Sequence, residues 1–131
     1  MKKDIESAVD IRNLVELFYD KVKQDPLLSP FFTQYIRVNW EKHLPVMTSF
    51  WENAVFYNGT YVGNPIQTHR RLNQLFPMTA DHFNQWLFLF TSSVNELFEG
   101  EKAELIKQKA FSIATIMKMK VTGADPFSTS H

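Results

Sequence analysis

The chain has 131 residues, which is enough for one domain with a sizeable core and too few for two stable domains of ordinary size. Its 14 Lys and Arg residues balance its 14 Asp and Glu residues, so its charge gives no reason to expect a nucleic-acid or anionic-membrane partner. Cysteine is absent, which excludes disulfides, thiolate catalysis and cysteine-based metal sites.

Neither a signal peptide nor a membrane span is predicted. The N-terminal stretch MKKDIES carries no long apolar run, and no segment approaches the roughly 20 apolar residues that a spanning helix needs. A soluble cytoplasmic protein is therefore expected. Aromatic residues are abundant, with 12 Phe, 3 Trp and 4 Tyr. They offer more flat apolar surface than a small core needs, which suits a pocket that encloses a large planar ligand.

The first predicted helix runs from Ala8 to Gln24, where apolar residues recur at three- and four-residue steps. It ends at Asp25-Pro26, because the residue before a proline is disfavoured in helical geometry. The segment from Leu27 to Asn39 is short and interrupted by Pro30. We expect a corner there, with at most one helical turn.

A second helix is predicted from Trp40 to Val55. Pro45 lies in its first turns, where the missing N–H costs little. Residues Tyr57 to Pro65 contain two glycines and a proline, which indicates a loop. At most a short helix is expected from Ile66 to Leu72.

The second half of the chain predicts two further long helices. Thr79 is a suitable N-cap, and Asp81 complements the positive end of the helix dipole. This helix continues to a stop at Gly100, and the last one runs from about Lys102 to Val121.

The expected fold is all-α, with four long helices in two pairs and short connecting pieces. No segment shows the period-two alternation and turn signals of paired strands. A single domain is expected over residues 1–123, followed by a flexible C-terminal tail over residues 124–131.

Two histidines stand among aromatic and aliphatic residues. His43 begins the apolar stripe of the second helix, and His69 follows a Gly-Asn-Pro break. Neutral imidazole is a common metal ligand, and one axial His in an apolar pocket is a usual way to hold haem iron. Zinc requires three or four converging ligands, and no cysteine or acidic cluster accompanies these two. The pair therefore indicates an iron porphyrin rather than zinc.

Several motifs then match a known family. In chain order they are Phe18-Tyr19, Pro30-Phe31-Phe32, His43-Leu44-Pro45 through Phe50-Trp51, Tyr61-Val62-Gly63-Asn64-Pro65 before His69, and Phe83-Asn84-Gln85-Trp86-Leu87. Each motif is weak alone, but their order and spacing are specific. Over almost its full length the chain resembles the group III truncated haemoglobins, and it lacks the glycine pairs of the other truncated groups. The resemblance implies a shortened globin fold, in which two antiparallel helix pairs sandwich haem b.

The resemblance also implies roles for single residues. His69 would be the proximal ligand to the iron. Tyr19, His43 and Trp86 would line the distal side, where O2, NO and CO bind. Donors in these positions would hold a gas ligand through hydrogen bonds to its oxygen.

Three further residues are expected at the porphyrin. The resemblance implies that Phe32 stacks on it and that Trp51 lies near a haem edge, within reach of a propionate. Met47, one turn after His43, is a core residue by its helical spacing and is also placed to touch the porphyrin face. An axial Met would raise the redox potential, but the globin resemblance argues against that role.

Each assignment has a simpler structural alternative. Considered alone, His69 would be a hydrogen-bonded structural residue, Tyr19 a packing residue with its hydroxyl at the surface, and His43 a residue that swings to solvent. Trp86 has an indole N–H that needs a partner when buried, and a pocket that holds a ligand supplies one. His82 is expected to be solvated capping surface.

The expected function is binding of O2 and other diatomic gases by haem b. Several donors around one ligand favour slow O2 release, which suits NO/O2 redox chemistry or detoxification better than delivery. Turnover would need a separate reductase, because no G-x-G-x-x-G motif is present. Two alternatives stay open: a gas sensor or oxygen carrier without turnover, and a cofactor-free all-α interaction module.

Overall fold

The computed structural model describes residues 2–30, 40–56 and 79–122. These residues form four helices: α1 (Ala8–Gln24), α2 (Trp40–Phe56), α4 (Ala80–Leu97) and α5 (Glu101–Thr122). Over the same three ranges there is no β-strand, so the all-α prediction is confirmed. All four helices begin within one residue of their expected starts.

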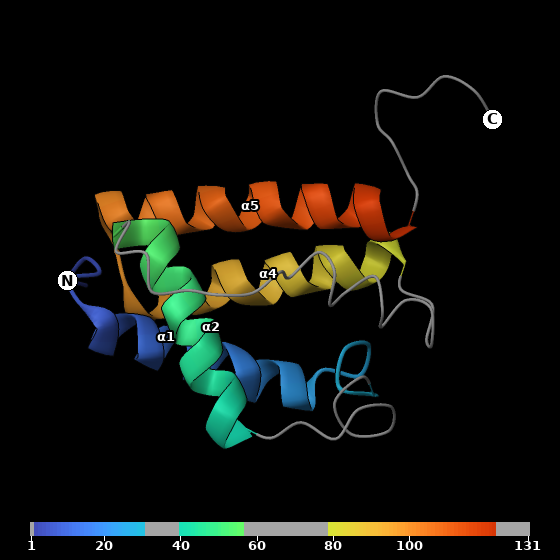
Figure 1. Ribbon diagram of the computed structural model, residues 1–131, viewed down its shortest axis with the longest axis horizontal. Helices are drawn as coiled ribbons and strands as arrows, with labels where there is room; N and C mark the ends of the chain where they lie inside the picture. The colour runs from blue at the N-terminus through green and yellow to red at the C-terminus, as the bar shows by residue number, and fades with distance from the viewer. Residues whose placement is uncertain (1, 31–39, 57–78, 123–131) are drawn as a thin grey trace.

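The helices pack as two pairs. In Figure 1, α4 and α5 lie side by side and antiparallel, and α2 lies across α1. α1 also contacts α4, and α2 also contacts α5, so the two pairs share one core. None of the described helices is long and apolar enough to cross a membrane. The short helix expected from Ile66 to Leu72 and the tail over residues 124–131 lie outside the described residues.

One face of α1 is buried, as its apolar spacing predicts. Its buried apolar residues are Ile11, Leu14, Val15, Phe18, Tyr19 and Val22. The helix ends at Asp25, whose carboxylate accepts hydrogen bonds from the backbone N–H groups of Leu27 (3.0 Å) and Leu28 (2.9 Å). These bonds turn the chain into the corner, because they satisfy backbone donors that no longer have helical partners.

The centre of the core is aromatic. Phe18 and Phe90 are almost completely buried, and their rings meet edge to face at 5.3 Å between centroids. Trp51 stacks on Phe90 at 4.4 Å. The buried Ser93 donates its hydroxyl to the Leu89 carbonyl at 2.8 Å, so this polar group is satisfied within its own helix.

The N-terminal segment caps the last helix. The Asp4 carboxylate accepts hydrogen bonds from the backbone N–H groups of Lys102 and Ala103, both at 2.9 Å. A carboxylate at this end satisfies orphan donors and complements the positive end of the α5 dipole. The backbone N–H of Glu99 also donates to the Lys3 carbonyl at 3.0 Å. The segment is thus fixed against the turn between α4 and α5.

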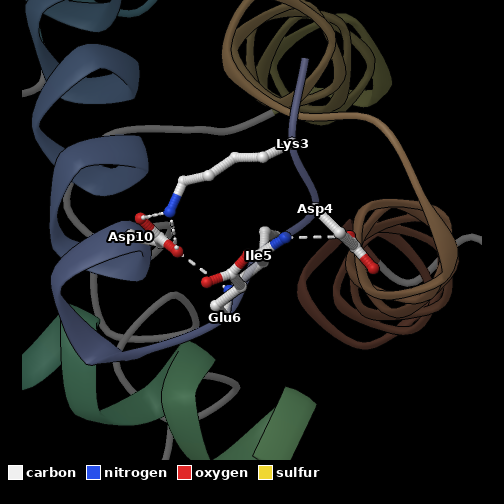
Figure 2. A network of polar contacts seen from close by, with 5 residues as sticks. All are labelled: Lys3, Asp4, Ile5, Glu6 and Asp10. Atoms are coloured by element: carbon white, nitrogen blue, oxygen red, sulfur yellow. Dashed lines mark hydrogen bonds and ion pairs between the residues drawn. The ribbon is translucent and has the colours of Figure 1, made fainter. Parts of the chain in front are cut away.

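The same segment is anchored to α1. Figure 2 shows the Lys3 ammonium at the Asp10 carboxylate, at 2.8 Å, and the backbone N–H of Glu6 donating to the same carboxylate at 2.8 Å. Ile5 lies between these two anchors and is 2% exposed. Residues 3–6 therefore join the start of α1 to the start of α5.

Candidate functional site

Tyr19 lies on α1 beside Phe18 and is buried. Its ring meets the rings of Phe18 at 4.9 Å and His43 at 5.0 Å, both edge to face. Burial raises the pKa of the Tyr19 phenol. The side chain therefore keeps its proton and its ability to donate a hydrogen bond across the physiological pH range.

His43 lies in the first turns of α2 and is half-buried. Its Nε2 atom is shielded from solvent, and its ring packs against Tyr19. The imidazole therefore does not adopt the solvent-facing alternative in this structure. Through this contact, α2 packs against the buried Tyr19 of α1.

Trp86 lies on α4, at the other side of Phe18. Its ring meets Phe18 edge to face at 5.8 Å and stacks on Phe90 at 5.7 Å and on Trp51 at 6.3 Å. Trp86 is only partly buried. Three helices thus contribute to one aromatic cluster, with a phenol, an imidazole and an indole as its polar members.

Two other predicted site residues lie beside this cluster. Trp51 is 4% exposed, and Met47 is half-buried and packs against the same core. His69 and Phe32 lie outside the described residues, so their roles stay predictions. Within the three described stretches, no group of three or more His, Cys, Asp or Glu residues could hold a metal ion.

The start of α4 is organised by His82. The backbone N–H of Thr79 donates to His82 Nδ1 at 2.8 Å. Desolvation lowers the pKa of His82, although the nearby Asp81 acts to raise it. A lowered pKa favours the neutral imidazole, which is the form that can accept this hydrogen bond. The residue expected to be capping surface does cap the helix, one turn before Trp86.

Sequence reasoning missed how the polar members are joined. Phe18 forms the link, since its ring contacts both Tyr19 and Trp86, and Phe90 packs against Phe18 and Trp86. The available signal was the spacing, because Phe90 follows Trp86 by four residues and shares its helix face. Spacing alone does not say which helix that face meets.

Comparisons with known proteins cover most or all of the described helices. The bacterial-like globin family matches residues 4–122. The group 3 truncated haemoglobin ctb of Campylobacter jejuni is 32% identical over 118 residues, covering 88% of this chain and 91% of that protein. The group 2 truncated haemoglobin YjbI of Bacillus subtilis is 27% identical over 97 residues, covering 73% of this chain and 71% of that protein.

A solved structure gives the same result in three dimensions. The crystal structure of a group III truncated haemoglobin from Campylobacter jejuni matches this chain with a TM-score of 0.82 and 28% sequence identity. The match covers 99% of this chain and 100% of the other. The shortened globin architecture expected from the sequence is therefore confirmed.

Proposed function

This chain belongs to the bacterial-like globin family, as a group III truncated haemoglobin, and we propose that it binds haem b and, through it, diatomic gases. The observation that carries the proposal is the meeting of Tyr19, His43 and Trp86, from three helices, in one aromatic cluster. Bound haem supplies an iron at which O2, NO or CO coordinates.

The described residues fit such a group by their chemistry. A gas-binding pocket needs apolar walls that exclude water and a few donors that recognise the ligand. Trp51, Trp86 and Phe90 supply flat apolar surface, and Tyr19 supplies a buried O–H that stays protonated. A phenol and a shielded imidazole side by side suit a pocket that recognises a small polar ligand.

We assign the proximal side to His69. The family match includes this position, and its imidazole would hold the iron of a bound haem. Phe32, Met47 and Trp51 are assigned to porphyrin contacts. Of these, Trp51 belongs to the core cluster that contains Tyr19, and Met47 packs against it.

On the distal side, the chain's own donors act on the gas ligand. With haem bound, the Tyr19 O–H and the Trp86 N–H would donate to a gas ligand whose oxygen carries negative charge, and the His43 ring would shield it beside Tyr19. Charge-assisted hydrogen bonds are stronger than neutral ones, so they slow O2 release. We therefore favour NO/O2 redox chemistry or detoxification over oxygen delivery, with a separate reductase that restores the ferrous state.

Haem binding is tested by titrating the purified protein with hemin. We expect a Soret band that saturates at one hemin per chain, and a shift of that band when CO is added to the reduced form. His69→Ala should lose the axial ligand, whereas the matched variant His82→Ala should bind hemin normally. A protein that takes up no hemin would overturn the proposal. An unchanged five-coordinate ferrous spectrum in His69→Ala would transfer the axial role to His43.

The redox part of the proposal has its own test. When the reduced, O2-saturated protein is mixed with NO, nitrate should form in a one-to-one ratio with the NO consumed, and the haem should be left ferric. One electron from the iron enters each turnover, so a reductant must be added for the next. If NO only displaces O2 and no nitrate forms, the sensor or carrier alternative replaces detoxification.

A further inference from the structure

A partly buried hydrogen bond joins the end of α1 to α4, one residue before Trp86. The Nε2 group of Gln85 donates to Asp25 Oδ1 at 2.6 Å, across 60 positions of sequence. Asp25 is 9% exposed, and its Oδ2 atom is held by the backbone N–H groups of Leu27 and Leu28. Three donors therefore fix the carboxylate, and the carboxylate fixes Gln85.

Gln85 immediately precedes Trp86 on α4, and Asp25 ends the helix that carries Tyr19. Successive residues on a helix point about 100° apart, so holding the Gln85 side chain sets the direction in which Trp86 leaves the helix. Phe18 provides a second contact between the same helices, through its ring edges on Trp86 and on Phe90. Apolar packing is not directional, so this contact alone would let α4 slide along α1. The 2.6 Å hydrogen bond depends on distance and angle, so it holds the two helices in one position.

We propose that Asp25 and Gln85 are positioning residues for the distal site: their hydrogen bond sets the rotation and register of α4 against α1, and thereby the placement of the Trp86 N–H relative to the Tyr19 O–H. This inference rests on the proposed function. Two donors from different helices can reach one small ligand only while the helices keep a fixed relation. A hydrogen bond weakens steeply when its distance or angle departs from the favoured range.

The decisive variant is Gln85→Leu, which keeps the size of the side chain and removes the donor. It leaves the bonds from Leu27 and Leu28 to Asp25 in place, so the corner should still fold. Asn84→Leu is the matched control, because it also removes a side-chain hydrogen bond of α4. In this case the lost bond is the one that the Asn84 amide oxygen accepts from Lys118 on α5. Gln85→Arg is the rescue variant, since a guanidinium also donates to a carboxylate.

The first readout is the placement of Trp86 itself. Its indole ¹H–¹⁵N signal, identified by its loss in Trp86→Phe, is recorded for the protein as purified and for its CO complex. We expect Gln85→Leu to shift this signal in both forms, and Asn84→Leu and Gln85→Arg to leave it near its original position. An unshifted Trp86 signal in Gln85→Leu would overturn the inference, even if the melting temperature fell.

The second readout is gas release from the haem-loaded variants. Gln85→Leu should speed O2 dissociation roughly three- to tenfold, with a much smaller effect on CO, because a misdirected donor still contributes part of its hydrogen bond. Equal changes for the two gases would mean general loosening of the fold and would overturn the positioning role. If Trp86→Phe leaves O2 release unchanged while Gln85→Leu still moves the indole signal, the distal role of Trp86 fails and the positioning of Trp86 stands.

Discussion

Tyr19 is both buried and able to donate a hydrogen bond. The neighbouring Phe18 packs in the core, and the Tyr19 ring lies against His43. Because burial raises the pKa of the phenol, the O–H is retained across the neutral pH range. Any ligand that enters beside Tyr19 and His43 therefore meets a donor that does not depend on pH in the neutral range.

The first prediction concerns Tyr19→Phe and Trp86→Phe in the haem-loaded protein. A hydrogen bond to a charged acceptor contributes roughly 1.5–3 kcal/mol, and about 1.4 kcal/mol is a tenfold change in an equilibrium constant. Each variant should therefore release O2 roughly ten- to a hundredfold faster. CO carries little negative charge on its oxygen, so its release should change much less.

The double variant is informative because both donors act on one ligand. Their effects should not add, since removal of one changes how well the other is placed. Stopped-flow measurements of O2 and CO dissociation for the two single variants and the double variant decide the matter. Equal changes for both gases would show that the pocket acts through shape alone.

The second prediction concerns His43 as a gate. Its Nε2 atom is shielded and its ring packs on Tyr19, so we expect the imidazole to move when a gas ligand passes beside the phenol. His43→Ala should therefore increase the CO association rate after flash photolysis. His82→Ala serves as the control, because His82 lies at the start of α4. An unaltered association rate in His43→Ala would contradict gating.

At the scale of elements, the turn between α4 and α5 depends on one glycine. Gly100 has φ +143°, and a Cβ added there would lie 2.5 Å from Asp4 Cγ. Only glycine combines this backbone conformation with so close an approach. The turn can therefore receive the Asp4 carboxylate that caps α5.

The third prediction follows from this packing. Gly100→Ala should lower the free energy of unfolding by roughly 1–3 kcal/mol, through backbone strain and displacement of the capping carboxylate. Glu99→Ala, at an exposed neighbouring position, should have little effect. Urea unfolding of the two variants provides the measurement. A Gly100→Ala protein as stable as wild type would show that the Asp4 cap adapts without cost.

For the whole molecule, local patterns predicted the helices and resemblance predicted the distal residues. Apolar spacing and capping residues act within one or two turns, so the starts of all four helices follow from nearby residues. The contacts that assemble the helices are not local. Asp4 meets Lys102 across 98 positions, and Asp25 meets Gln85 across 60. Apolar periodicity does not predict such pairs. The sequence around Asp4 or Asp25 would be the same if the carboxylate faced solvent instead of a distant partner.

The same long-range contacts determine how the molecule responds to acid. Desolvation acts to raise the pKa of Asp4 and of Asp10, but the backbone N–H donors at Asp4 and the Lys3 ammonium at Asp10 outweigh it, so both pKa values lie below 3.8. Desolvation also lowers the pKa of His82 below 6.5. A group whose pKa is lower in the folded state adds stability above its unfolded pKa, and loses it as the pH falls through its folded pKa.

The last prediction is therefore that the described residues with lowered pKa values contribute to a decline in unfolding free energy in two separate windows as the pH falls. The upper window begins near pH 6.5 and belongs to His82, and the lower one begins near pH 3.8 and belongs to Asp4 and Asp10. His82→Gln should flatten only the upper window, and Asp4→Asn should reduce only the lower one. Urea unfolding from pH 3 to pH 7 measures both. If Asp4→Asn leaves the lower window unchanged, the Asp4 cap of α5 does not contribute to acid unfolding, and Asp10 alone accounts for that window.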